Sequence, residues 1–482
     1  MMDKKYNGHA LHTDLYQINM GYVYFKDGIH TKKSYFDVYF RKAPFGGGYA
    51  VFAGLAKIID YLNDFKFNKD DIDYLATLGY DNDYLEYLSN LKFTGSVRSV
   101  REGEIVFGNE PLIRIEAPLI QAQLIETAIL NIVNYQTLIA TKASRIKHIC
   151  PEETCIEFGT RRAHEFDAAI WGARASIIGG FDATSNVKAA KLFDIPCSGT
   201  HAHSFVQAYQ DEKLAFKKYA EYHKDCYFLV DTYDTLRSGV PNAILVADEL
   251  GNKINFKGIR LDSGDIAYLS KEARKMLDDA GYKDAKIIAS NDLDEGTITH
   301  LKQQGAKVDV WGVGTKLITA YENPALGCVY KLVCLEDDNG VMVDRLKISE
   351  NPAKLTTPGI KKVYRIINNK NGMAAGDYIA LESEDVNSYD SIKLFHPTHT
   401  YLSKEVQDFT AIDLHEDIFI EGKQVYDVPS IESSKKYLQQ SKDLFWMEYT
   451  RILNPEFYPV DLSYKCWENR SEILNSLKKD IK

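Results

Sequence analysis

The chain is short of the features that mark several classes of protein. None of its apolar runs approaches the roughly 20 residues that a membrane span needs, and its opening residues, MMDKKYNGHALHTDLYQ, lack the apolar core of a signal peptide. Lysine and arginine number 58 against 68 aspartates and glutamates, so the net charge is −10. A nucleic-acid binder that neutralises phosphates is therefore disfavoured. We expect no membrane and no nucleic-acid partner.

Cysteine is also scarce. The seven cysteines are odd in number and form no Cys-x-x-Cys pair, so neither a disulfide framework nor a zinc cluster is expected. Reduced thiols predict a cytoplasmic protein. With 45% hydrophobic and 26% charged residues the composition is that of a globular chain, and 482 residues exceed the roughly 250–300 that one core holds. More than one domain is expected.

The pattern of residues changes twice along the chain, which predicts three parts: 1–150, 151–340 and 341–482. The first part mixes helices and short strands, and the last carries more charges and turns. Expected strands of the first part are 31–40, 97–100, 104–107 and 112–116, and its expected helices are 49–63 and one or two within 119–149. In the last part we expect strands within 351–365 and at 376–381, and helices at 431–448 and 469–477.

The middle part repeats a short apolar strand, a polar tip and a helix. The six strands are expected at 154–158, 195–197, 227–230, 257–261, 286–289 and 308–311. Such strands alternating with helices are typical of a buried parallel sheet. Polar residues gather at the carboxyl ends of all six, which favours an irregular (β/α) barrel with its chemistry on that face.

Two histidines lie in the polar segment after the second of these strands. His201 and His203, with Thr200 and Ser204 beside them, could bind a metal, act as a base or accept a phosphoryl group. A metal would need a third ligand, and the spacing is not that of a helical zinc pair. Capping and hydrogen-bonded histidines are the alternative.

Two other tips carry arginine. Phe158, Gly159 and Thr160 precede Arg161 and Arg162, whose planar guanidinium groups suit carboxylate or phosphate oxygens. Both arginines could instead pair with Glu157 or Glu165.

The tip at 260–265 combines Arg260 with Asp262 and Asp265. Asp265 is the better candidate for the N-cap of a helix expected at 266–280, which leaves Asp262 for a ligand such as a sugar diol.

The last tip predicts a phosphate site. Gly312 and Gly314 expose backbone N–H groups and Thr315 adds a hydroxyl, while Ser290 and Asn291 end the preceding strand. Phosphate sites of barrels occupy this position. Three further motifs support no function alone: the glycines at 46–48, His396 with His399, and the lysine-rich end.

These motifs, in this order, resemble those of the nicotinate phosphoribosyltransferase family. The resemblance covers about residues 10–330 and is carried by residues 13–17, 40–55, 158–162, 198–204, 260–265 and 312–315. It implies an irregular (β/α) barrel with an N-terminal α/β sandwich domain. From the pattern of the last part we also expect a C-terminal α+β extension that packs back on the body. The resemblance also implies a homodimer that makes nicotinate mononucleotide and pyrophosphate from nicotinate and phosphoribosyl pyrophosphate, with ATP as co-substrate, in NAD salvage.

The resemblance implies a role for each matched residue. His203 is the phosphorylated histidine, and Phe158 stacks on the base together with Tyr16 of the other subunit. Thr160 and one of Arg161, Arg162 and Arg260 hold the nicotinate carboxylate. Asp262 binds ribose hydroxyls; Gly312, Gly314 and Thr315 bind the 5′-phosphate. Mg²⁺ is held through substrate phosphates and needs no dedicated protein site.

Two other functions remain open from the residues. Nicotinamide phosphoribosyltransferase shares the fold and the histidine chemistry, although it would use an acidic group where this family uses a cation. A sugar-phosphate isomerase or lyase barrel would explain the phosphate site and the carboxylates, but not the two histidines.

Overall fold

The structure is a computed structural model that describes residues 9–348 and 355–480. The chain forms two compact units, one made of Met1–Leu138 with Ala325–Lys482 and the other of Ile139–Pro324. These units cut across the expected boundaries, since most of the first and third expected parts belong together. No helix of the described residues is long and apolar enough to cross a membrane.

The largest sheet of the first unit combines strands from both ends of the chain. Its order is β13-β12-β1-β5-β3-β19-β20, and all neighbours are antiparallel. Its strands are β1 (Lys33–Tyr39), β3 (Ser96–Ser99), β5 (Ile113–Pro118), β12 (Val329–Glu336), β13 (Met342–Asp344), β19 (Glu416–Ile420) and β20 (Lys423–Gln424). The C-terminal extension therefore shares backbone hydrogen bonds with the N-terminal domain.

The strand expected at 31–40 is present as β1, and it is buried on both faces. Asp37 is 2% exposed, and its carboxylate lies 2.9 Å from Nζ of Lys361, which is also buried. A buried charge needs a partner of opposite sign. That partner comes from far along the chain, so the periodicity of β1 alone could not reveal it.

The helix expected at 49–63 is divided, whereas the stretch 119–149 forms two helices, which is one of the two expected possibilities. Residues 49–63 form β2 (Ala50–Val51), which pairs with β4 (Ile105–Val106), and then α2 (Leu55–Asn63). Gly54 separates them with φ 116°, a conformation that favours glycine. Residues 119–149 form α5 (Leu119–Leu124) and α6 (Glu126–Ile149). The remaining N-terminal helices are α1 (Leu15–Lys26), α3 (Lys69–Thr77) and α4 (Asn82–Ser89).

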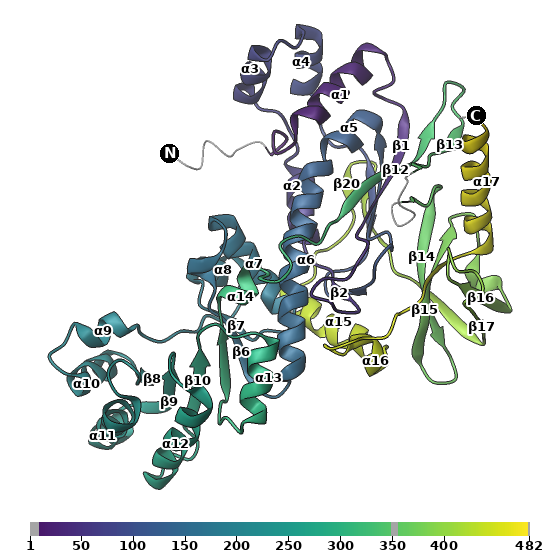
Figure 1. Ribbon diagram of the computed structural model, residues 1–482. Helices are drawn as coiled ribbons and strands as arrows, with labels where there is room; N and C mark the ends of the chain where they lie inside the picture. Colours follow the sequence, from purple (N-terminus) through teal and green to yellow (C-terminus); the bar gives the residue numbers. More distant parts are fainter. Residues whose placement is uncertain (1–8, 349–354, 481–482) are drawn as a thin grey trace. The chain divides into compact units, whose positions relative to one another are not determined.

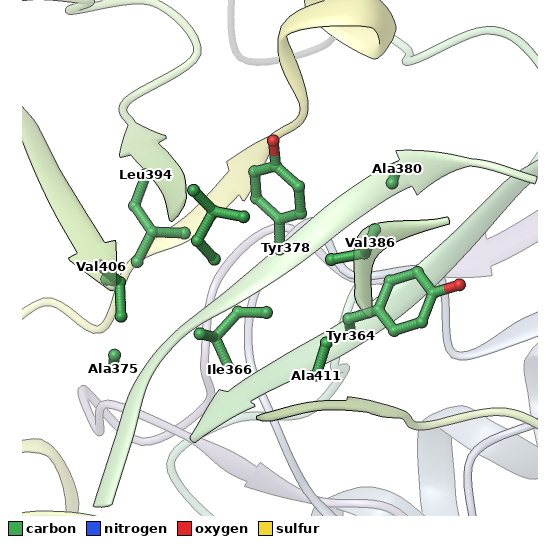
Figure 2. Close-up of a cluster of buried hydrophobic side chains, with 10 residues drawn as sticks. Tyr364, Ile366, Ala375, Tyr378, Ala380, Val386, Leu394, Val406 and Ala411 are labelled. Atoms are coloured by element: carbon green, nitrogen blue, oxygen red, sulfur yellow. The ribbon is translucent and has the colours of Figure 1, made fainter. Parts of the chain in front are cut away.

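The C-terminal part of the first unit has its own core, shown in Figure 2. A sheet of order β18-β14-β15-β21 and the hairpin β16-β17 surround it, and Ile366, Tyr378 and Leu394 are among its buried side chains. The elements are β14 (Lys361–Asn368), β15 (Met373–Leu381), β16 (Ser391–Phe395), β17 (Ser403–Gln407), β18 (Phe409–Asp413), β21 (Val460–Leu462), α15 (Ile431–Asp443), α16 (Met447–Thr450) and α17 (Tyr464–Asp480). The expected helices at 431–448 and 469–477 lie in α15, α16 and α17. Part of the stretch 351–365 lies outside the described residues.

The second unit is built on a parallel sheet of order β7-β6-β11-β10-β9-β8 (Figure 1). Its strands are β6 (Thr154–Glu157), β7 (Ala183–Thr184), β8 (Asp225–Leu229), β9 (Asn255–Leu261), β10 (Lys286–Ser290) and β11 (Val310–Val313). The expected irregular barrel is confirmed. Residues 195–197 contribute only a bridge between Cys197 and Thr184, and β7 is too short to have shown a pattern.

Helices follow most of these strands, so the residues after β6, β8, β9, β10 and β11 lie at one edge of the sheet. The helices are α7 (Phe166–Ile178), α8 (Val187–Phe193), α9 (His203–Gln207), α10 (Glu212–Tyr222), α11 (Val240–Leu250), α12 (Ile266–Asp279), α13 (Glu295–Gln303) and α14 (Thr315–Ile318). Asp265 caps α12 as predicted, since its side chain accepts the N–H of Tyr268.

Candidate active site

His203 is the first residue of α9 and faces two carboxylates. Its Nδ1 lies 3.1 Å from Oγ1 of Thr232. Its Nε2 lies 3.8 Å from a carboxylate oxygen of Asp231 and 3.8 Å from one of Asp262. The side chain is 37% exposed. The ring thus has its neighbours in the segments that follow β8 and β9, and it remains partly exposed.

Asp231 is a residue of this group that the sequence reasoning did not select. Its side chain is 2% exposed, and Oδ2 accepts hydrogen bonds from the backbone N–H of Asp262 at 2.9 Å and the hydroxyl of Ser263 at 2.6 Å. Oδ1 is buried, has no hydrogen-bond partner among the residues that the structure describes, and is the oxygen nearest His203. The available signal was the position of Asp231 directly after the strand at 227–230.

Arg260, Asp262 and Ser290 form a hydrogen-bonded cluster beside the histidine. The Arg260 guanidinium donates to Asp262 at 2.7 Å, to Ser290 at 2.9 Å and to Thr200 at 3.1 Å. Burial acts to raise the pKa of Asp262, but the Ser290 hydroxyl, Arg260 and His203 together hold this pKa below its ordinary value. Asp262 is therefore a carboxylate at neutral pH. A guanidinium has five N–H groups, so two of those on Arg260 remain for a ligand.

His201 has a structural position. It is 8% exposed, its Nε2 accepts the backbone N–H of Leu229 at 3.3 Å, and its ring packs near Phe205 and Tyr219. Burial lowers the pKa of His201 to about 4, so the imidazole is neutral at pH 7. Its hydrogen bond to Leu229 of β8 and its burial indicate that His201 stabilises the second unit.

Phe158 follows β6 and lies against a buried cluster that includes Ile156, Ile288 and Val310. The guanidinium carbon of Arg260 lies 5.4 Å from the centre of its ring. A side chain at Gly312 would meet this ring, because a Cβ there would lie 2.5 Å from Cδ2 of Phe158. Gly312 was expected to offer a backbone N–H to phosphate, and it also makes room for the aromatic ring.

Thr160, Arg161 and Arg162 form a short 3₁₀ turn and are exposed. The pairing of these arginines with Glu157 or Glu165 is not found. Glu157 accepts from Gly159 and Thr184, and Glu165 from the N–H of Phe166. Among the described residues neither guanidinium has an acidic partner, so both are available to an anion.

The expected phosphate segments end β10 and β11. Asn291 and Asp292 have φ of 85° and 36°, which non-glycine residues rarely adopt and which cluster at functional sites. Thr315 begins α14 after Gly314, and Lys316 pairs with the Asp294 carboxylate. The turn after β10 is therefore held in an unfavourable backbone conformation beside the expected phosphate segment.

Tyr16 belongs to the first unit, on α1, and is 48% exposed. The segment 13–17 acts as a capping box: the Asp14 side chain accepts from the backbone of Gln17, and Oε1 of Gln17 accepts the N–H of Asp14 at 2.8 Å. Burial raises the pKa of Tyr16, with Glu126 contributing. The phenol is therefore neutral at physiological pH.

No group of three or more histidine, cysteine, aspartate or glutamate side chains that could hold a metal occurs in the described part of the chain. Nδ1 of His396 accepts the N–H groups of Thr398 and His399, so these histidines stabilise a turn. All seven cysteines are free.

The fold and this edge of the sheet define an open parallel α/β barrel that brings an imidazole, a guanidinium and two carboxylates together at its strand ends. The chain belongs to the nicotinate phosphoribosyltransferase family. Residues 11–134 match the N-terminal domain of that family, 154–344 the family itself and 360–470 its C-terminal domain.

Relatives and solved structures agree with this assignment. The chain is 64% identical to the nicotinate phosphoribosyltransferase of Bacillus subtilis, over 98% of this chain and 96% of that protein. It is 36% identical to that of Dictyostelium discoideum, over 95% and 86%. The crystal structure of human nicotinic acid phosphoribosyltransferase is similar with a TM-score of 0.86 at 29% identity, covering 96% of this chain and 99% of that one.

Proposed function

We propose that this chain converts nicotinate, phosphoribosyl pyrophosphate, ATP and water to nicotinate mononucleotide, pyrophosphate, ADP and phosphate, a salvage step toward NAD. The observation that carries the proposal is His203 at the open strand ends, held at Nδ1 by Thr232 and faced at Nε2 by the carboxylates of Asp231 and Asp262. A phosphoryl group on this imidazole is the link between ATP cleavage and transfer.

The nicotinate ring stacks on Phe158, and its carboxylate binds Arg260. Arg260 is favoured over Arg161 and Arg162 because its guanidinium lies over the Phe158 ring and keeps two N–H groups free. Thr160, at the tip of the same loop, adds a hydroxyl and a backbone N–H. The exposed Arg161 and Arg162 are then free to attract the pyrophosphate of the other substrate.

Transfer at the ribose needs no general base, because the pyridine nitrogen of nicotinate already has a free lone pair. Catalysis consists of positioning the reactants and stabilising an oxocarbenium-like centre and the departing pyrophosphate. Asp262, whose lowered pKa keeps it charged, accepts hydrogen bonds from the ribose hydroxyls. The 5′-phosphate binds the segments after β10 and β11, at Ser290, Asn291, Gly312, Gly314 and Thr315.

Mg²⁺ would be held mainly through the phosphates of the substrate. Asp262 and the unpartnered Oδ1 of Asp231 are the protein oxygens that fit it best, since hard cations prefer carboxylate ligands and both face His203. When bound it supplies positive charge to the departing pyrophosphate.

Phosphorylated His203 carries about two negative charges at the strand ends. This charge lies beside the carboxylates of Asp231 and Asp262, and the repulsion between them is relieved when a cation binds. Phosphorylation therefore favours binding of the substrate together with its metal. Hydrolysis of the phosphohistidine after transfer reverses this preference and favours release of pyrophosphate. ATP cleavage thereby drives transfer toward the mononucleotide.

The working form is proposed to be a cytoplasmic homodimer in which Tyr16 of one subunit covers the base bound at Phe158 of the other. The exposure of Tyr16 supports this role, because its ring is accessible to a second subunit.

The test is product formation with Mg²⁺ and phosphoribosyl pyrophosphate, offering nicotinate or nicotinamide, each with and without ATP. Mononucleotide from nicotinate, increased by ATP with release of ADP, is the expected result. Arg260→Lys is the matched variant, because it keeps the charge and loses the planar fork. It should lose preference for nicotinate. Product from nicotinamide alone would assign the chain to the sister reaction, and no product from either base would overturn the proposal.

A further inference from the structure

Glu157, the last residue of β6, is a buried acid without a cation. It is 0% exposed and lies between β7 and β11, paired in register with Thr184 and Val313. Among the described residues no lysine, arginine or histidine forms an ion pair with it. Burying an unpaired carboxylate is unfavourable. Glu157 directly precedes residues 158–162, called the substrate loop below, so its presence there requires an explanation.

Both carboxylate oxygens of Glu157 are used to hold chain segments. Oε1 accepts the backbone N–H of Gly159, and Oε2 accepts the hydroxyl of Thr184 at 2.6 Å. The hydroxyl oxygen of Thr184 in turn accepts the N–H of Asn186 at 3.0 Å. Asn186 is the N-cap residue of α8. Glu157 thereby ties the start of the substrate loop to the neighbouring strand.

The Gly159 bond fixes the residues on both sides of it. The carbonyl of Gly159 accepts the N–H of Arg162 at 2.7 Å and of Ala163 at 3.1 Å, which closes the 3₁₀ turn. A Cβ at Gly159 would lie 2.6 Å from Cβ of Ile318, so the backbone is also packed tightly from the other side. Phe158 lies between Glu157 and Gly159, and its direction depends on both.

We propose that Glu157 is a positioning residue for the base: its carboxyl group anchors Gly159 and so fixes the direction of Phe158 and of the turn at 160–162. The inference rests on the proposed binding of nicotinate at Phe158. Burial raises the pKa of Glu157, while the bonds from Thr184 and Gly159 act to lower it. Hydrogen-bond acceptance, which a neutral side chain can also provide, is therefore the property that matters.

Two substitutions separate anchoring from bulk and charge. Glu157→Gln keeps an acceptor oxygen and the volume without charge, whereas Glu157→Leu keeps volume and leaves the N–H of Gly159 without its partner. Cys155→Ala is the matched control, because Cys155 is buried on the same face of β6. Its thiol shares a hydrogen bond with the thiol of Cys150 and makes none with the loop.

Glu157→Leu should raise the KM for nicotinate about tenfold. The KM for phosphoribosyl pyrophosphate should rise less, to no more than about threefold above the wild-type value, because Arg161 and Arg162 on the same turn attract its pyrophosphate from exposed positions, where their exact direction matters less. Glu157→Gln should restore the KM for nicotinate to within about threefold of wild type, and Cys155→Ala should leave both constants unchanged. Equal increases in both constants for Glu157→Leu, or a Gln variant as impaired as the Leu variant, would overturn the proposal.

Hydrogen exchange at the Gly159 amide tests anchoring without any substrate. The amide should exchange slowly in the wild type and in Glu157→Gln, and quickly in Glu157→Leu. If Glu157→Leu does not fold, Thr184→Val should give a smaller acceleration and a smaller rise in KM, because it removes the donor to Oε2 and the acceptor for the N–H of Asn186 but leaves the bond from Gly159 to Oε1. Unchanged protection of the Gly159 amide in Glu157→Leu, or in Thr184→Val where that variant replaces it, contradicts the anchoring role. A wild type that is inactive toward nicotinate but shows the expected exchange would overturn the proposed function alone.

Discussion

Arg260 in the second unit and Arg365 in the first unit use the same chemistry in opposite surroundings. Arg365 donates to Asp377 at 3.0 and 2.8 Å and also pairs with Glu104, and all three side chains are at most 2% exposed. Arg260 binds Asp262 at 2.7 Å, but this pair is 16% and 26% exposed. One cluster is closed to solvent and the other lies beside His203 at the open strand ends.

The difference in exposure separates a structural ion pair from one that is available for the proposed binding of substrates. Arg365 links β14 to Asp377 of β15 and to the carbonyl of Ile105, so its donors join elements that are far apart in the sequence. Arg260 joins neighbouring strands and retains free N–H groups. Loss of Arg365 should therefore lower the free energy of unfolding, whereas loss of the groups around Arg260 should impair substrate binding and turnover.

The largest expected effect is on the open cluster. His203→Ala should abolish ATP-coupled turnover while changing the free energy of unfolding by less than about 1 kcal/mol, because the ring is partly exposed. Slow transfer without ATP should remain. The measurement is ADP released per mononucleotide formed, with unfolding monitored in parallel. Coupled turnover in this variant would contradict the role of His203.

The closed cluster should show the reverse behaviour. Arg365→Met leaves two buried carboxylates without their cation, so the free energy of unfolding should fall by about 3–5 kcal/mol. Urea unfolding checks this value, and turnover per folded molecule should be unchanged. Asp262→Asn is the control from the open cluster, and it should lose turnover with a change in stability below about 1 kcal/mol. Equal destabilisation by both substitutions would remove the distinction between the clusters.

His201 gives the second unit a defined dependence on pH. Its pKa is about 4 in the folded protein against an ordinary value near 6.5, so folding favours the neutral ring. The resulting stability is fully present above pH 6.5 and is lost as the pH falls toward 4. Between pH 7.5 and 5 the wild type should lose about 2 kcal/mol more than His201→Gln, which lacks the titrating ring. Parallel pH profiles for the two proteins would contradict this assignment.

The smallest expected effect concerns Gly312. Gly312→Ala places a Cβ within 2.5 Å of the Phe158 ring, so the ring must move. The KM for nicotinate should rise about tenfold, which corresponds to about 1.4 kcal/mol. Steady-state kinetics with each substrate check this prediction. Gly314→Ala is the milder control, because its Cβ would come no closer than 3.1 Å to a neighbour, the carbonyl oxygen of Phe158. An unchanged KM for nicotinate in Gly312→Ala would show that the ring does not take part.

The parallel barrel and the clustering of its tips could be predicted from the sequence, because strand and helix alternate and parallel strands end at one edge. Phe158 and Asp262 directly follow β6 and β9, and Arg260 is the last residue but one of β9. His203 lies in the polar segment after the strand expected at 195–197. The N-cap role of Asp265 followed from its position before an apolar helical pattern.

Other features depended on contacts that no local pattern reveals. Asp231 owes its position near His203 to bonds with Asp262 and Ser263 from β9 and the segment that follows it. The union of N- and C-terminal strands depends on pairing of β1 with β12 and of β3 with β19. These arrangements follow from packing between distant segments.

The most direct test of the account is to locate the phosphate. The wild type, His203→Ala and His201→Ala are each incubated with ATP and Mg²⁺, and the acid-labile phosphate is mapped by peptide mass spectrometry. The account predicts one phosphate on His203 in the wild type and in folded His201→Ala, and none in His203→Ala. A phosphate that remains in His203→Ala, or one found on His201, would contradict it.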